Sequence, residues 1–255
     1  MAKLKLKMHL LFNEPIELNP KKIKKAEDFK SLDLDILEKK KGKFLMEVGY
    51  DSEAWYKHVN KKSTIDLETL KEQAELFEGL EGALNRSEAY KAAKDHKFYV
   101  ELKVESFSDG KIDMVRNMFL CACLVTYTER PTAIYIPQTG LVVSMDDFQH
   151  YAINNMGDKI LSACWFNIIL KEKNGRITAY SKGLDALKKH DLEVTMPVAE
   201  KQNAHHYVRN LGIHCVANKK YKDGQESCDL NDVPYTMILK KSKNLGYEIF
   251  EMVKD

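Results

Sequence analysis

The residues that most invite chemistry in this chain are three histidines on one predicted helix. The apolar spacing predicts a helix over 198–217, and His205, His206 and His214 all lie within it. At roughly 100° per residue, and with Ala204 as the origin, these side chains project at about 100°, 200° and −80°. Imidazoles on three sides of one helix cannot converge on one ion, so the pattern predicts no metal site here.

The five cysteines give no stronger signal. Cys121 and Cys123 lack the two-residue spacer of a redox or zinc pair, and on a helix their sulfurs point about 200° apart. The sequence contains no nucleophile elbow, no glycine-rich phosphate loop and no paired-histidine zinc helix. We therefore expect buried thiols, no cofactor and no catalytic residues, which favours a protein that is not an enzyme.

Composition limits the classes of partner. The chain has 40 basic and 38 acidic residues, for a formal net charge of +2, whereas nucleic-acid binders carry a clear basic excess. Lysines are concentrated in the first quarter, without the interleaved aromatics of a single-strand binder, so the composition argues against a nucleic-acid partner. No apolar run reaches the ~18 residues of a membrane span, and MAKLKLKMHLLF is unlike a signal peptide. We expect a cytoplasmic protein without a membrane partner.

The first half of the chain reads as alternating strands and helices. Period-2 alternation predicts a strand over 3–12, and an Asn19-Pro20 start predicts a short helix after it. Further strands are predicted over 43–50, 55–59 and 98–104, and helices over 64–78 and 87–94. Apart from the extra helix over 87–94, this is the element order of a ferredoxin-like split βαβ unit.

The rest of the chain mixes apolar helices with hairpins. An Asn174-Gly175 pair between two apolar runs predicts a tight hairpin, and Ser144 predicts a helix start. Helices are predicted over 111–127, 145–156 and 198–217, a polar loop over 219–232, and strands over 133–136, 160–171, 176–180, 192–196, 234–240 and 247–253. The pattern predicts an α+β fold with mixed or antiparallel sheets. We place a boundary between 1–158 and 159–255, with a shared core as the alternative.

The second half carries a family resemblance. Ala163-Cys164-Trp165-Phe166, the segment 179–184 (AYSKGL) and Leu192-Glu193-Val194 resemble the bacterial family of domain of unknown function four-two-six-one. His206-Tyr207, Asn210-Leu211 and Lys222-Asp223-Gly224 extend the resemblance, which is strongest over 162–253 and weaker over 88–158. The chain departs from the family at Leu187-Lys188, where members have an aromatic-Gly pair, and at 226–232, where they have a Gly-Phe stretch.

The resemblance implies a bacterial cytoplasmic origin and an α+β fold, and it brings no catalytic residues. Tyr180, Gly183 and Glu193 lie in its most specific part and are the candidate binding residues. The alternative is structural: glycine permits a turn, and the other two fix strand ends by hydrogen bonds.

Three functions remain open at this stage. The first is a non-enzymatic module that binds a protein partner, as bacterial immunity or adaptor proteins do, an analogy drawn from fold class. The second is an enzyme or small-molecule binder with a site in a cleft between the two halves. The third is a weak nucleic-acid binder that uses the lysine-rich first quarter.

Overall fold

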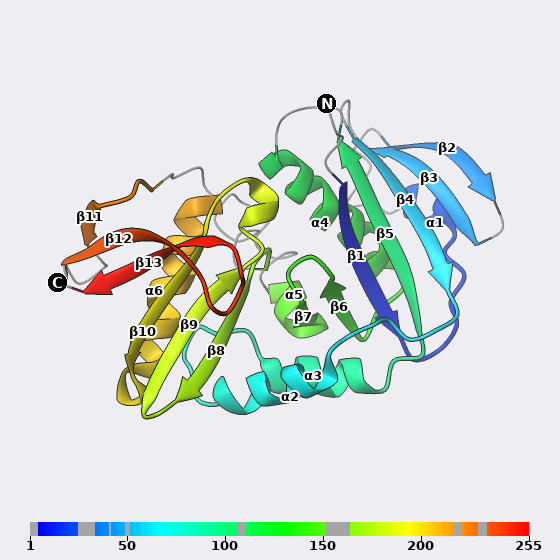
Figure 1. The fold of residues 1–255 in the computed structure, drawn as a ribbon. Helices are drawn as coiled ribbons and strands as arrows, with labels where there is room; N and C mark the ends of the chain where they lie inside the picture. Colours follow the sequence, from blue (N-terminus) through cyan, green and yellow to red (C-terminus); the bar gives the residue numbers. More distant parts are fainter. Residues whose placement is uncertain are drawn as a thin grey trace.

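The computed structural model describes residues 5–24, 34–40, 42–48, 52–106, 111–150, 164–216, 221–228 and 234–254. Two sheets stand at an angle to each other, with helices along their faces and across their lower ends (Figure 1). The α+β class predicted from the sequence is confirmed. The predicted boundary between residues 158 and 159 lies outside the described residues.

The first sheet has seven strands in the order β2-β3-β4-β5-β1-β6-β7, and each pair is antiparallel. Its strands are β1 (Lys5–Phe12), β2 (Leu34–Lys40), β3 (Lys43–Val48), β4 (Ser52–Val59), β5 (Phe98–Ser106), β6 (Ala133–Ile136) and β7 (Leu141–Ser144). The alternation predicted for the first strand is present, since Leu6, Met8 and Leu10 are all buried on one face.

The second sheet has six strands in the order β11-β12-β13-β10-β9-β8. They are β8 (Asn167–Lys173), β9 (Arg176–Lys182), β10 (Asp191–Pro197), β11 (Gln225–Cys228), β12 (Pro234–Lys241) and β13 (Glu248–Lys254). The pair β10–β13 is parallel and the others are antiparallel, so this sheet is mixed. The predicted Asn174-Gly175 hairpin is confirmed, with φ of 54° and 70°, the two positive values that a type I′ turn needs.

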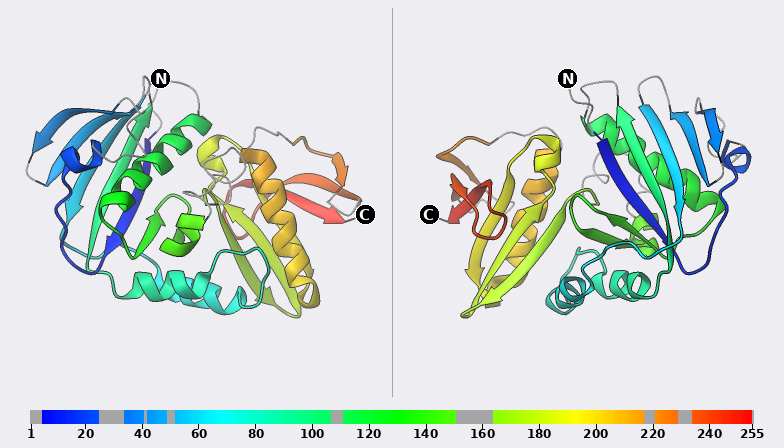
Figure 2. Two further views of the ribbon diagram at one scale, coloured as in Figure 1. Left: turned by 180° about the vertical axis from the view of Figure 1, so that it is seen from behind. Right: turned by 45° about the vertical axis from the view of Figure 1, so that its right-hand side comes forward.

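Helices cover three sheet faces. The long helix α4 (Lys111–Thr128) packs against β1, β4 and β5, and α6 (Lys201–Val216) packs against β8, β9 and β10. Figure 2 shows both helices from behind. The helices α2 (Leu67–Leu76) and α3 (Arg86–Lys94) lie together across the other face of the first sheet, and α2 reaches β8 of the second. The described residues also form the short helices α1 (Pro20–Lys24) and α5 (Met145–Phe148).

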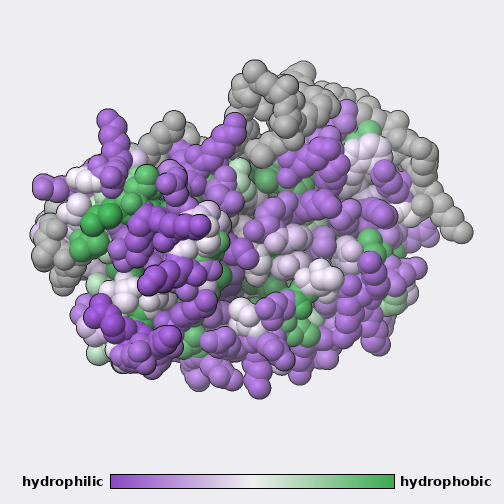
Figure 3. Space-filling model, viewed as in Figure 1, coloured by the Kyte–Doolittle hydropathy of each residue, from purple (hydrophilic) through white to green (hydrophobic). Residues whose placement is uncertain are grey.

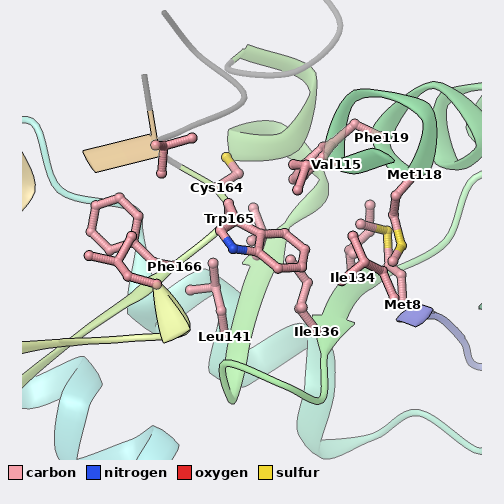
Figure 4. Close-up of a cluster of buried hydrophobic side chains, with 14 of the residues drawn as sticks. Met8, Val115, Met118, Phe119, Ile134, Ile136, Leu141, Cys164, Trp165 and Phe166 are labelled. Atoms are coloured by element: carbon pink, nitrogen blue, oxygen red, sulfur yellow. The ribbon is translucent and has the colours of Figure 1, made fainter. Parts of the chain in front are cut away.

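The two sheets share one buried apolar cluster. Trp165, which is fully buried in the turn before β8, packs among Leu141, Ile136 and Val115 of the other half (Figure 4). Its indole Nε1 donates to the backbone oxygen of Gly183 at 3.1 Å. The indole therefore joins the β6–β7 hairpin to the second sheet, and the cluster continues from α4 to α6 without a break.

The ferredoxin-like detail is not shown. A split βαβ unit needs parallel strands, whereas β1 lies between β5 and β6 and is antiparallel to both. The α2–α3 hairpin returns the chain beside β4, so β5 pairs with β4 as well as with β1. Three strands were also missed: β2 lies in a lysine-rich stretch, β7 directly precedes the helix predicted from 145, and β11 lies within the predicted polar loop.

The cysteines predicted to be buried are buried where the structure describes their side chains: Cys121, Cys123, Cys164 and Cys215. Burial raises the pKa of Cys121, Cys123 and Cys164 to about 12, so these thiols stay protonated and unreactive near neutral pH. Within the described ranges, no helix is both long and apolar enough to cross a membrane.

Candidate functional site

Two of the predicted binding residues are direct neighbours. Tyr180 and Glu193 face each other across β9 and β10, and both are nearly fully buried. Burial and the charge of Glu193 raise the pKa of Tyr180 to about 12. The Glu193 carboxylate accepts from Ser242 Oγ at 2.9 Å and Asn244 Nδ2 at 3.1 Å, and it pairs with Lys240 at 3.4 Å. These bonds anchor the turn between β12 and β13.

Gly183 belongs to a second polar network at the end of β9. The fully buried Asp191 carboxylate accepts from Ser181 Oγ at 2.7 Å and from Tyr247 OH at 2.7 Å. It also accepts from the backbone N–H groups of Gly183 and Leu184. Since one buried carboxylate satisfies four donors, the turn after β9 has a single arrangement.

The three predicted residues do not form one site, but two of them adjoin a cavity between the sheets. Its volume is about 210 Å³. Tyr180 pairs in register with Ile169, which lines the cavity, and Gly183 directly follows Lys182, which also lines it. Glu193 lies one strand further away. A binding role for the three residues therefore stays a prediction.

Four parts of the fold form the cavity wall. They are the start of α2 with the residues before it (64–73), Arg86 on α3, the β6–β7 hairpin (135–140), and β8–β9 through Asn167, Ile169 and Lys182. Asp66 caps α2, accepting from the backbone N–H of Thr69 at 3.0 Å and from its hydroxyl at 2.8 Å. Residues from both sides of the predicted boundary therefore meet in this cavity.

The cavity wall is held in place by side chains that bond to the edge of β8. The amide of Gln73 donates to the backbone oxygen of Leu170 at 2.9 Å and accepts from its N–H at 2.8 Å. Arg86 Nη2 donates to Ile168 O at 3.4 Å and to Asn167 Oδ1 at 2.9 Å. Two side chains thus take the place of a neighbouring strand, and they fix α2 and α3 against the second sheet.

The most unusual group in the wall is Arg86, which is only 5% exposed. It begins α3 directly after the cap residue Asn85, whose side chain accepts from Glu88 N. Its Nε is fully buried and has no hydrogen-bond partner among the residues described. Burial lowers the pKa of Arg86 to about 10, which still leaves the guanidinium charged at neutral pH.

Ser63, His9 and Glu101 are arranged in the order of a catalytic triad, but their surroundings do not support catalysis. Ser63 Oγ lies 2.6 Å from His9 Nδ1, and Glu101 lies 3.7 Å from His9 Nε2. The carboxylate favours a proton on Nε2, so Nδ1 accepts from the serine hydroxyl, as a general base would. However, Ser63 and His9 are buried and do not line the cavity, and the Ser63 N–H donates to His96 Nε2. The group fastens the segment before α2 to β1.

The histidines of α6 lie in three different settings, as helix geometry predicts. His205 is buried against Phe77, His206 interacts with Gln202 and Glu81, and His214 is exposed. Burial lowers the pKa of His205 to about 3. Across the part of the chain that the structure describes, no three His, Cys, Asp or Glu side chains are placed to hold a metal ion.

Sequence reasoning missed Arg86, Asn167, Lys182 and Gln73. Arg86 stands at the start of a charged, exposed helix, where an arginine is normally solvated. The residue that could have indicated the site is Gln73, which lies next to Ala74 on the apolar stripe of α2. A polar residue in such a position indicates a buried amide with a specific hydrogen-bond partner.

Comparison with known proteins identifies no relative: no family model, no curated protein and no solved structure matches this chain. The resemblance to domain of unknown function four-two-six-one therefore stays a prediction.

Proposed function

We propose that this protein binds a small polar metabolite in the cavity between its two sheets, the second of the three functions considered from the sequence. The observation that carries the proposal is a cavity with both polar and apolar lining residues, formed jointly by α2, α3, the β6–β7 hairpin and β8–β9. Ligand sites are concave, mostly preformed, and preferentially lie where two substructures meet.

The volume indicates the size of the ligand. A cavity of about 210 Å³ is larger than the ~150 Å³ that accommodates benzene. It is smaller than the ~300 Å³ at which drug-sized pockets begin. A compact metabolite fits these limits, and a nucleotide or a folded peptide does not.

A larger groove elsewhere has the wrong chemistry. It has a volume of about 500 Å³ and is open to solvent beside α3 and α5. Its charges already pair with one another, Arg130 with Asp146 at 3.0 Å and Lys91 with Glu88 at 2.7 Å. The cavity between the sheets is the better candidate because its cations, Arg86 and Lys182, form no ion pair with any residue that the structure describes.

The test is a thermal-shift screen of small metabolites against the protein and one occluding variant. Thr69 lies at the exposed rim of the cavity, so Thr69→Trp should block entry. Glu68→Trp is the matched control, because Glu68 is exposed on the same helix and does not line the cavity. We expect at least one compound to raise the Tm of the wild type and the control, and not of Thr69→Trp. A hit that acts equally on all three would place binding elsewhere and contradict the proposal.

A protein partner is the second candidate, as the sequence suggests. The observation that favours it is a pair of exposed apolar side chains, Ile238 and Val253, which are diagonal neighbours on β12 and β13. Figure 3 shows apolar surface over these strands. Ile238→Lys should abolish co-purification of a partner, whereas Val198→Lys, an exposed apolar site elsewhere, should not. Equal recovery of the partner with both variants would contradict this role for the β12–β13 surface.

A further inference from the structure

We propose that the ligand of this cavity carries a compact oxyanion, a carboxylate or a phosphate group, which Arg86 and Lys182 bind. This inference rests on the proposed function and names the chemistry of its ligand. It starts from a buried cation that forms no ion pair with any described residue.

The guanidinium of Arg86 is in an unfavourable position without an anion. Charged side chains are almost never buried unless they are paired, because removing an ion from water is energetically costly. The ion pairs formed by the described residues do not include Arg86. Among the described residues, its hydrogen bonds go to a neutral amide and to a backbone carbonyl, and Nε has none. These contacts orient the group, and none of them is to a charged partner.

The groups around Arg86 carry charges of both signs, and no described carboxylate forms an ion pair with it. The carboxylate that acts on Arg86 most strongly is Asp147, which accepts from the backbone N–H of Asn85 at 2.6 Å. Asp66 is the acidic residue of the cavity wall, and both its oxygens cap α2. Arg209 and His205 share with Arg86 the wall of a second cavity of about 20 Å³. That space suits one water, which would satisfy a hydrogen bond without neutralising a charge.

The donors of the cavity wall converge. Lys182 Nζ and Asn167 Nδ2 both lie next to Gly140 of the β6–β7 hairpin. A Cβ atom at that position would be 3.8 Å from the lysine nitrogen and 4.0 Å from the amide nitrogen. Asn167 Oδ1 accepts from Arg86, which directs its Nδ2 donor elsewhere. Lys182 takes part in no ion pair with any described residue. A guanidinium, an ammonium and an amide N–H₂ together form a site for oxygen acceptors that carry negative charge.

The experiment is a titration of purified protein with sodium acetate, sodium succinate and inorganic phosphate, followed by Tm. Sodium chloride at matched ionic strength and neutral succinamide are the controls. We expect a saturable rise in Tm with at least one oxyanion and none with either control. The carboxylates and phosphate are separate arms, so the response also tells which oxyanion the site prefers.

Two variants assign the response to the site. Lys182→Met and Arg86→Met should each reduce the apparent affinity tenfold or more, whereas Lys173→Met, an exposed lysine outside the cavity, should leave it unchanged. The lysine variant keeps the test valid if Arg86→Met fails to fold. Equal responses in Lys182→Met and wild type would overturn the inference.

The two proposals can fail separately. If neutral compounds stabilise the protein in a way that Thr69→Trp abolishes, and oxyanions do not, the cavity binds ligands but the oxyanion inference is wrong. If oxyanions stabilise Thr69→Trp as well as wild type, both the inference and the assignment of the ligand to this cavity are contradicted.

Discussion

Gly183 has a φ of 117°, a value that residues with a Cβ rarely adopt, and a Cβ there would collide with Cγ2 of Thr139. Thr139 belongs to the β6–β7 hairpin and lines the cavity. The close approach of Gly183 therefore positions one cavity wall against the other.

Gly183→Ala should consequently destabilise the protein by about 2–4 kcal/mol, because backbone strain and the collision add. Thr139→Ser removes the colliding methyl group and keeps the hydroxyl that bonds to Ile136 O and Leu141 N. In a double-mutant cycle measured by urea denaturation, the double variant should recover part of the loss. Strictly additive effects would show that the contact is not as close as described.

Buried neutral histidines predict how stability depends on pH. Burial is the largest effect and lowers the pKa of His9 to about 4. Glu101 opposes this shift, and the charges of Lys7 and His96 lower the pKa further. The unfolded chain therefore takes up a proton first as the pH falls. The contribution of neutral His9 to the free energy of unfolding should be fully present above about pH 6.5. It should fall by roughly 3 kcal/mol as the pH falls towards 4.

Urea denaturation at pH 7.5, 6 and 4.5 measures this dependence. His9→Gln should make the decline shallower, while His214→Gln, at an exposed site of α6, should leave it unchanged. Stability that rises as the pH falls from 6.5 would contradict a buried neutral imidazole at position 9.

At the scale of elements, the decisive contact is the one between α2 and the edge of β8. Gln73 satisfies both backbone groups of Leu170, which otherwise face away from β9 without a strand beside them. An unsatisfied buried backbone group costs about 1–3 kcal/mol. This contact sets the distance between α2 and β8, and hence the width of the cavity between them.

Gln73→Ala should lower the free energy of unfolding by about 2–4 kcal/mol, since two buried backbone groups lose their partners. Lys71→Ala, at an exposed position of α2, should change it by less than ~0.5 kcal/mol. Hydrogen exchange at the Leu170 amide is the direct measurement, and it should accelerate in Gln73→Ala alone. Unchanged protection would mean that another group satisfies this amide.

Most elements could be predicted from sequence because each carries its own periodicity. The strand over 133–136, the Asn174-Gly175 turn and the apolar stripe of α6 depend on local patterns and are present in the structure. β2 and β11 are polar segments that become strands through pairing with β3 and β12, which no local pattern reveals. The structure does not show the predicted ferredoxin-like arrangement for the same reason, because long-range packing decides which strands become neighbours.

At the scale of the whole molecule, the same limit applies to the candidate site. Arg86, Asn167 and Lys182 are far apart in sequence and meet only because two sheets pack on one core around Trp165. The sequence is compatible with a cleft between the two halves, which is the second of the three functions that it leaves open. It could not indicate which side chains line that cleft, since a buried arginine and a solvated one look alike in a helix.

The most direct test of the central claim observes the Arg86 side chain itself. In a ¹⁵N spectrum of arginine Nε–H groups, titration with succinate or inorganic phosphate should move the Arg86 signal saturably and leave that of exposed Arg130 in place. An Arg86 signal that stays unmoved at saturating concentrations of both anions would contradict the account of this cavity as an oxyanion site.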